Sequence, residues 1–546
     1  MANNWALPWH ERLIRRSVLF GWRLRKIATP PPQHWFPADL WRGVATRGQP
    51  LVSGNHPVET HAEGWHSFNW LRDMREFGGS QSRTMARRLV IEWVNQYGRW
   101  AATEWHPSMI ASRLKSIVML WGWFGESAAL SQQQMMVTSI AVQLDCLKRD
   151  WRGLTDADDR LEALAAIVIT GLFLDPDFDM DSYATALSDN LSGRVLADGG
   201  HVSRRPDRHL RLLTCLIEAR TALAAAKTWR EDLPKTALET LEALDDSIIR
   251  MGATGRMWRH VDGSLMAIPG ALEVDHDMFE QVLLRAGPNG KVTHHAGDSG
   301  FIRLASGRSV LLMNSAPSPW VNTAEQTADA GVLAIEFSNG TNRIIINAGQ
   351  RDNLAETSPD LALALAGSAA HSTLAIDQLN AADTEKGERR ATGKESATGP
   401  VEGGIAAIAD HDGYESTHGV LHTRRVFLAT GGYELRGEDE IRYTGLPGAI
   451  PQQAVIRFHL HPRISASLSI GGTVMLRLPG AAAPWVFKTT NGKLSVEDSI
   501  MLGPEGLEKT SQITLCVGLE GLRTKGLITT RWGLRRQAAA KKAAAT

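Results

Sequence analysis

A twelve-residue stretch, DGGHVSRRPDRH at residues 198–209, contains two histidines, three arginines and two aspartates. Pro206 is typical of a first helical turn and Asp207 is favourable near the positive end of the helix dipole, so we expect a loop that leads into a helix. Backbone N–H groups at such a helix start favour anions. The stretch predicts an anionic ligand, with His201 or His209 as the group that moves a proton.

Three arginines of this stretch are candidate contacts for the anion: Arg204, Arg205 and Arg208. In a uronic-acid polysaccharide, β-elimination removes the proton at C5, and a cation beside the uronate carboxylate lowers that barrier. A histidine or tyrosine must accept the proton, and another group must protonate the departing O4. A different interpretation pairs the arginines with Asp198 and Asp207. The sequence leaves both interpretations open.

A second polar group lies in HSFNWLRD, residues 66–73, where polar side chains alternate with apolar ones as at a helix start that faces a cleft. Indole rings stack on the C–H faces of sugars, and twelve of the eighteen tryptophans precede residue 124. The candidate substrate contacts here are Asn69, Trp70 and Arg72. A salt bridge from Arg72 to Asp73 or Glu76 is the competing explanation, and most tryptophans could instead be core residues.

Composition excludes several classes of function. Lysine plus arginine equals aspartate plus glutamate at 59 each, so no global field attracts nucleic acid. Three separated cysteines form neither a disulfide framework nor a zinc ribbon. The longest apolar run, residues 164–174, is far shorter than the roughly 20 residues that cross a bilayer, and we expect a buried helix there. A glycosidase needs two carboxylates beside the bond, and no pair stands out.

The elements that position these residues change period along the chain. Between about residues 60 and 260 apolar residues recur at three and four positions, which predicts a helical barrel or toroid. After about residue 290 the period is two, which predicts an antiparallel β-sandwich. Glycine-centred turn signals, Asn-Gly at 339–340 and 491–492 and Gly-Gly at 431–432 and 471–472, predict hairpins.

These periods predict an α+β protein with four segments. They are an arm at 1–45, a helical domain at 46–275, a sandwich at 276–530 and a flexible tail at 531–546. Residues 10–27 form a basic amphipathic pattern, which we interpret as an arm helix docked on the protein rather than a membrane-surface helix. The first residues lack the order of a secretory signal, so we expect a cytoplasmic protein, with the periplasm or cell envelope as the alternative.

The chain resembles the bacterial heparinase II/III-like family of polysaccharide lyases over roughly residues 35–530. The motifs that carry the resemblance are HSFNWLRD (66–73), LADGGHVSRRP (196–206), DSGFIR (298–303), AGVLAIE (330–336), AAHSTL (369–374), LHTRR (421–425) with GED (437–439), and RFHLHP (457–462). The resemblance implies an incomplete (α/α) toroid followed by a β-sandwich, and an acidic polysaccharide as substrate. It also implies that His371, in AAHSTL, reaches the cleft, although a hydrogen-bonded core histidine on a strand would look the same.

Two departures from the family pattern bear on activity. The resemblance places a tyrosine that acts as acid and base where this chain has Arg208, and a guanidinium does not normally deprotonate in a protein. Related lyases bind a structural zinc, but of its ligands only His371 remains here; Asp329 could supply an oxygen, yet one imidazole is no zinc site. We therefore expect no metal and no other cofactor.

Two functions follow as hypotheses. The preferred one is a lyase that cleaves an acidic, uronate-containing polysaccharide, with His201, His209 and His371 as catalytic candidates. The alternative is a non-catalytic protein that binds glycan or assists envelope assembly. A lyase that uses another tyrosine would have to choose among Tyr97, Tyr183, Tyr414, Tyr433 and Tyr443.

Overall fold

A computed structural model describes residues 35, 37–54, 63–287, 292–316, 329–384, 391–393, 395–481 and 483–537. The predicted arm helix at 10–27 lies outside these residues. The chain divides into two compact units that interleave along the sequence. The helical unit takes residues up to 194, 211–249 and 284–286, and the sandwich unit takes 195–210, 250–283 and residues from 287 onward. The loop at 198–209 therefore belongs to the sandwich unit, although it lies within the helical stretch of the sequence.

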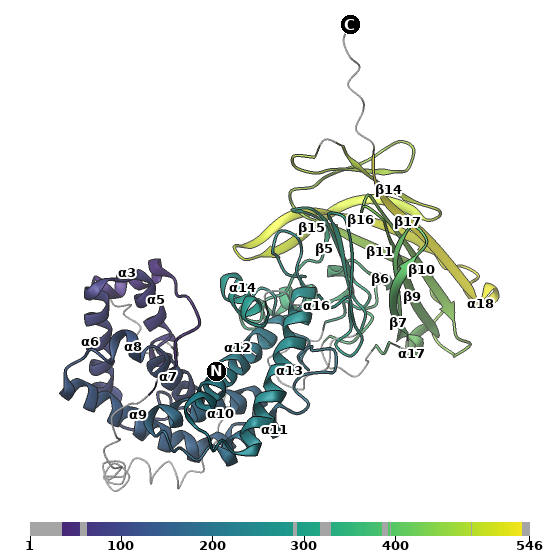
Figure 1. The fold of residues 1–546 in the computed structure, drawn as a ribbon. Coiled ribbons are helices and arrows are strands. Elements are labelled where there is room, and N and C mark those ends of the chain that lie inside the picture. The colour runs from purple at the N-terminus through teal and green to yellow at the C-terminus, as the bar shows by residue number, and fades with distance from the viewer. Residues whose placement is uncertain are drawn as a thin grey trace. The chain divides into compact units, whose positions relative to one another are not determined.

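Helices make up the N-terminal part of the chain, as the 3.6-residue period predicted (Figure 1). They are α3 (Ala45–Val52), α4 (Glu63–Ser67), α5 (Trp70–Phe77), α6 (Gly79–Tyr97), α7 (Pro107–Met119), α8 (Trp121–Phe124), α9 (Leu130–Asp150), α10 (Ala157–Leu174), α11 (Asp181–Leu191), α12 (Pro206–Trp229), α13 (Lys235–Met257) and α14 (His276–Arg285). The apolar run at 164–174 is the buried end of α10, which confirms that expectation. No helix among the described residues has the length and apolar character needed to span a bilayer.

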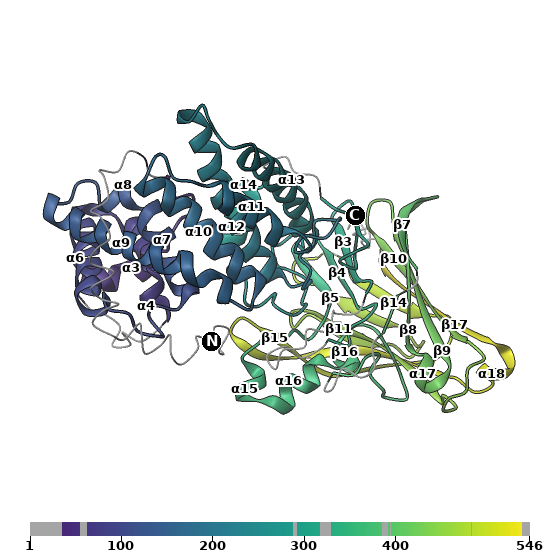
Figure 2. The same ribbon diagram turned by 90° about the horizontal axis from the view of Figure 1, so that it is seen from below.

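The sandwich unit contains two antiparallel sheets, drawn as separate layers in Figure 2. The nine-stranded sheet contains β1 (His295–Ala296), β2 (Phe301–Ser306), β3 (Ser309–Asn314), β4 (Ile335–Asn339), β5 (Asn342–Ile346), β11 (Gln453–Leu460), β16 (Gly506–Gly518) and β15 (Lys493–Gly503) in that order, with β6 (Leu374–Ile376) also paired to β11. The eight-stranded sheet has the order β12 (Ser465–Leu468), β13 (Val474–Arg477), β14 (Trp485–Thr489), β17 (Leu527–Arg536), β10 (Glu434–Tyr443), β9 (Val420–Ala429), β8 (Gly404–Tyr414) and β7 (Ser396–Val401). Short helices α15 (Leu354–Thr357), α16 (Pro359–Ala366), α17 (Glu415–His418) and α18 (Leu522–Lys525) connect strands.

Alternating apolar residues of both sheets meet in one core, which includes Phe337, Val426, Phe458 and Trp532. The α+β class, with helices followed by an antiparallel sandwich, is confirmed.

The glycine-centred turns test the predicted hairpins. Those at 339–340, 431–432 and 471–472 join neighbouring strands of one sheet, as expected. The hairpin predicted at 491–492 is wrong, because β14 pairs with β17 and β15 pairs with β16, so this turn carries the chain from one sheet to the other. The predicted tail also begins too early: residues 531–536 form the end of β17, where Trp532 fills the core.

Candidate functional site

The loop before α12 is built on Asp198. Its Oδ1 accepts a hydrogen bond from the backbone N–H of Gly200 at 2.8 Å, and its Oδ2 accepts from the N–H and the hydroxyl of Ser299 at 2.6 and 3.0 Å. Gly199 has φ of +85°, and a Cβ there would lie 2.3 Å from the carbonyl oxygen of Arg250, so only glycine fits. Asp198 thus ties the loop to Ser299, just before β2 in the sandwich unit.

Arg204 is buried in the sandwich unit and has φ of +58°, a conformation unusual for a residue other than glycine. Its guanidinium donates to the carbonyl oxygens of Ser299, Gly300 and Ala316 and, at 2.6 Å, to Oδ1 of Asn314. It also lies over the ring of Phe301. Burial lowers the pKa of Arg204 to about 10, so the side chain stays charged near neutral pH. The predicted anion contact is a cation that clamps the loop onto β2 and β3.

Arg205 is also buried and forms two ion pairs. Its Nη2 lies 2.9 Å from a carboxylate oxygen of Asp207, the pairing that the structural interpretation predicted, and 2.5 Å from one of Asp352. Asp352 lies 147 residues from Arg205 in the sequence, so the residues around Arg205 gave no indication of this ion pair. Arg208, the residue at the family's tyrosine position, is partly exposed.

The two loop histidines are fully buried. His201 Nδ1 lies 2.7 Å from the hydroxyl of Ser203 and accepts a hydrogen bond from the backbone N–H of Ser203. His209 Nε2 donates to the carbonyl oxygen of Met251 at 2.9 Å, and its ring meets Trp258 edge-on. Burial, with His201 nearby, lowers the pKa of His209 to about 3, so this imidazole is neutral at physiological pH. Its Nδ1 is buried and contacts no hydrogen-bond partner among the described residues.

His371 is buried beside Asp329, with 3.0 Å between its Nε2 and a carboxylate oxygen. Its Nδ1 donates to the carbonyl oxygen of Gly367 at 2.9 Å. Burial opposes the charged form, but the Asp329 carboxylate outweighs it and raises the pKa of His371. Both ring nitrogens therefore act as donors, and the ring is a hydrogen-bonded core imidazolium.

A zinc site does not fit these residues. The oxygen ligand that we considered, Asp329, is engaged by His371 and by the N–H of Gly331. Within the described ranges, no three His, Cys, Asp or Glu side chains come close enough together to hold a metal ion.

The predicted contacts in the helical unit are arranged differently. Phe68 has φ of +63°, and the following Asn69 is exposed at the start of α5. Its Oδ1 accepts hydrogen bonds from the hydroxyls of Ser112 and Ser116, one turn apart on α7, at 3.4 and 3.3 Å. Because the oxygen is engaged, the amide NH₂ is the group that Asn69 offers to solvent. Trp70 is mostly buried and stacks on Trp65.

Arg113 holds the segment before α5 in place from the interior of the helical unit. It is fully buried and donates to the carbonyl oxygens of His66 and Glu104 and to Oε1 of Gln143. The guanidinium also lies 4.1 Å from the ring centre of Trp93. The sequence signal was an arginine within the apolar pattern of α7, which indicates a buried cation that needs partners.

Arg72 does not pair with Asp73 or Glu76. It contacts Asp39 at 3.1 Å and Glu218 at 3.5 Å. Glu218 is a hub that sequence reasoning missed: it also accepts from Lys115 and from the indole N–H of Trp41, each at 2.7 Å. Its partners lie on segments more than a hundred residues away, so only the lysine within the apolar face of α7 hinted at a buried carboxylate.

Of the residues predicted from sequence, the structure places His201, Arg204 and Arg205 in the loop before α12, and Arg208 and His209 in the first turn of α12. In all of these except Arg208, the side chain is buried. Asn69 is the predicted contact that is most exposed.

Comparison with known proteins agrees with this architecture. The family model described as "Heparinase II/III-like, C-terminal" matches residues 288–532, which include strands β1 to β16 and the first part of β17. This part of the chain is therefore similar to the C-terminal domain of heparinase II/III-like proteins. A heparinase III structure superposes with a TM-score of 0.64 at 12% identity, covering 97% of this chain and 91% of that one. The heparan sulfate lyase HepC from Pedobacter heparinus gives 0.62 at 14% identity, covering 96% and 89%. These likenesses confirm the fold expected, a helical toroid with a β-sandwich.

One relative has a different kind of name. FtsZ-localized protein C of Caulobacter vibrioides is 28% identical to this chain over 467 residues, which are 80% of this chain and 76% of the relative. The fold is thus that of polysaccharide lyases, while the name of this relative records a cellular position.

Proposed function

We propose that this protein binds an acidic polysaccharide on a lyase scaffold and does not cleave it. The observation that carries the proposal is the state of the three candidate bases. Proton abstraction requires an acceptor within hydrogen-bond reach of the substrate C5–H. His201 and His209 are fully buried, and His371 already donates from both nitrogens.

The family's tyrosine gives no alternative route, since Arg208 occupies that position in the resemblance and does not deprotonate. Another tyrosine supports the same proposal. Tyr414 is buried and donates to the carbonyl oxygen of Leu374 at 3.0 Å. A phenol whose hydroxyl is buried and hydrogen-bonded to the backbone, as in Tyr414, is not placed to shuttle protons to a polysaccharide.

Binding is supported in the helical unit by Asn69. Its exposed NH₂ group supplies two N–H donors that suit a uronate carboxylate, and the hydroxyls of Ser112 and Ser116 fix its orientation. Fixing a donor in advance reduces the entropy lost on binding. Asn69 is therefore the side chain with which we test recognition.

The test uses the full-length protein with polygalacturonate, heparan sulfate and neutral dextran. Isothermal titration calorimetry measures binding, and the ultraviolet absorbance of unsaturated uronate measures elimination. We expect saturable binding of an acidic polymer, no binding of dextran and no growth of absorbance. Absorbance that grows with time and is abolished by His201→Ala would instead establish a lyase.

A second candidate function is suggested by the FtsZ-localized relative, whose similarity extends over four fifths of this chain. We propose that this protein also occupies the division site, from the cytoplasmic side. A fluorescent fusion expressed from the native locus should form a band at midcell. Diffuse fluorescence, or recovery of the fusion in the periplasmic fraction, would contradict this candidate.

A further inference from the structure

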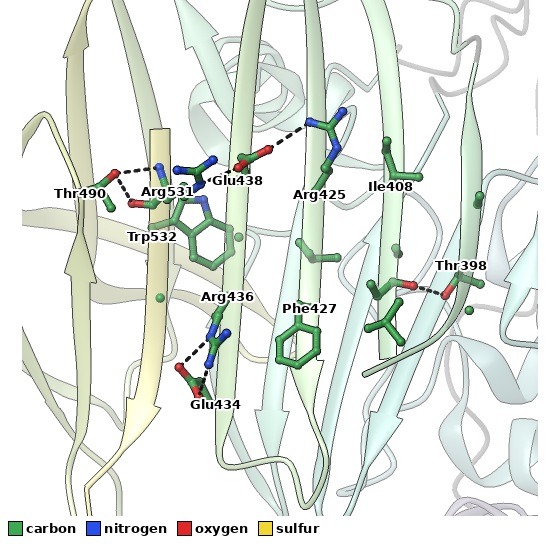
Figure 3. A pocket seen from close by; sticks show the side chains of 18 of the residues that line it. Thr398, Ile408, Arg425, Phe427, Glu434, Arg436, Glu438, Thr490, Arg531 and Trp532 are labelled. Atoms are coloured by element: carbon green, nitrogen blue, oxygen red, sulfur yellow. Dashed lines mark hydrogen bonds and ion pairs between the residues drawn. The ribbon is translucent and has the colours of Figure 1, made fainter. Parts of the chain in front are cut away.

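The outward face of the eight-stranded sheet carries an open trough of about 720 Å³ (Figure 3). Its lining residues come from β7, β8, β9, β10, β17 and β14, six neighbouring strands of that sheet. Adjacent strands lie about 4.8 Å apart, so the trough extends roughly 24 Å across them. It therefore has room for an extended chain that crosses the strands. No residue of the 198–209 loop lines it.

The trough exists because small residues stand where larger ones would fit. A Cβ on Gly399 would meet nothing within 4 Å, and one on Gly533 would meet only a carbonyl oxygen at 3.6 Å. Neither residue has positive φ. Gly437 differs, because its Cβ would lie 2.0 Å from the indole of Trp532 in the core. Packing thus requires Gly437, whereas neither packing nor backbone conformation requires Gly399 or Gly533.

The floor of the trough combines an aromatic ring with aliphatic side chains. Phe427 and Ile408 are half-buried on the outward face of the sheet. Polar side chains are more usual on such a solvent-exposed face. The guanidinium of Arg436 lies over the Phe427 ring, 5.3 Å from its centre. An aromatic ring bordered by guanidinium donors is a surface on which a sugar ring stacks its C–H face and donates or accepts hydrogen bonds at its edge.

Paired charges border this floor (Figure 3). Glu438 accepts from Arg425 at 3.2 Å and from Arg531 at 2.7 Å, and Arg436 pairs with Glu434 at 2.9 Å. Each guanidinium has five N–H donors, and these ion pairs use only some of them. The pairs hold the arginines in place, which leaves preoriented donors and acceptors for hydroxyl and carboxylate groups.

The border has a net positive charge. The lining of the trough includes four cations, Arg425, Arg436, Lys488 and Arg531, and two carboxylates, Glu434 and Glu438; beside the lining, Glu440 also pairs with Arg425 at 2.9 Å. The chain as a whole has no net charge, so this excess is local. Charge complementarity therefore favours an anionic occupant.

We infer that this trough binds a segment of acidic polysaccharide. The inference rests on the proposed function and names a second binding surface for it, apart from Asn69. An extended peptide would pair with the edge strand, whereas the trough crosses the strands and the edge strand β7 contains Pro400, which donates no ladder hydrogen bond. The open, polar-bordered shape suits a hydrated chain of sugars.

Calorimetric titration of the full-length protein with polygalacturonate tests the inference. Gly399→Phe fills the trough from a position with open space, and Arg436→Glu reverses one exposed charge on its border. We expect each to weaken binding at least tenfold. Gly471→Phe is the matched control, because Gly471 also lacks positive φ and close neighbours but lies between β12 and β13, at the other edge of the sheet. The control should bind within twofold of wild type.

Thermal unfolding of each variant verifies the fold. If wild type binds and both trough variants bind equally well, the trough is not the site and the inference is overturned, while the proposed function stands. If wild type binds no acidic polymer, both are overturned. A loss of binding confined to the trough variants, with unchanged melting temperatures, supports the inference.

Discussion

The sandwich unit contains two groups of arginines that sequence composition alone does not distinguish. In the loop at 198–209, Arg204 is buried and donates to backbone and amide oxygens of the same unit. On the outward face of the eight-stranded sheet, the side chain of Arg436 is 62% exposed and rests on an aromatic ring. Both side chains are guanidinium groups that donate hydrogen bonds to oxygen atoms. Only the second retains donors that a ligand in solvent can reach.

The comparison of Arg204 with Arg436 shows that clustered charged side chains can either stabilise the fold or remain accessible to a ligand. A buried guanidinium must satisfy its donors internally, since an unsatisfied buried charge is costly. A surface ion pair contributes little to stability, about 0 to 1 kcal/mol, and so can be rearranged around a ligand at small cost. The first group therefore holds the loop, and the second is available for recognition.

The largest expected effect is on the buried arginine. Arg204→Met should lower the free energy of unfolding by about 3 kcal/mol, because it leaves the oxygens of Gly300, Asn314 and Ala316 without their donor. Arg436→Met should change it by less than about 1 kcal/mol. Chemical denaturation of the two variants beside wild type measures both values. Equal decreases in the free energy of unfolding for the two variants would show that Arg204 does not stabilise the fold more than Arg436 does.

Buried and exposed carboxylates should also differ in how much they make the stability of the protein depend on pH. Glu336 is fully buried beside His260 and Arg343; burial opposes its charged form, but Arg343 and His260 outweigh it and lower its pKa to about 2. The unfolded chain binds this proton near pH 4.3. The resulting stability, about 2 to 3 kcal/mol, is present above that pH and is lost as pH falls toward 2.

The slope of unfolding free energy against pH should accordingly be shallower in Glu336→Gln between about pH 4.5 and 2. Glu434→Gln, in the ion pair with the exposed Arg436, serves as the control and should change the slope less than Glu336→Gln, because solvent weakens the pair that lowers the Glu434 pKa. A steep slope retained in Glu336→Gln would mean that other carboxylates account for the acid sensitivity.

The smallest effect concerns Asn69. Asn69→Ala should weaken binding of polygalacturonate about fivefold, or roughly 1 kcal/mol for one neutral hydrogen bond, and should leave the melting temperature unchanged. Asn69→Asp, which replaces the NH₂ donors by a repelling carboxylate, should weaken binding further. Calorimetry at one salt concentration compares the two, and binding unaffected by either variant would remove Asn69 from the recognition surface.

The spacing of apolar residues predicted most of the fold. Its period changes from 3.6 residues in the helices to 2 in the strands, and this period depends only on which face of each element is buried. Pro206 and Asp207, rather than periodicity, predicted the start of α12, which begins at Pro206. Periodicity could not separate the 491–492 turn from a hairpin, since a glycine turn looks the same whether its strands pair with each other or with β17 and β16. Strand partners are a long-range property.

The candidate site was harder to predict for a related reason. Residue types identified Arg204, His209 and His371 as chemically able, but exposure depends on partners far along the chain, such as Asn314 for Arg204 and Met251 for His209. The trough gave no local signal, because Gly399 on β7 and Gly533 on β17 line one surface only through the order of the strands between them. Its alternating charges resembled an ordinary solvated strand face.

The central claim is that no imidazole of the 198–209 loop, nor His371, reaches a substrate proton. Exchange of the uronate C5–H for deuterium tests it directly, since abstraction is detectable even where elimination does not follow. Proton NMR of polygalacturonate oligomers in D₂O, incubated with saturating full-length protein, should show the C5–H signal at the intensity seen without protein. Loss of that signal, absent when His201→Ala replaces wild type, would contradict the account.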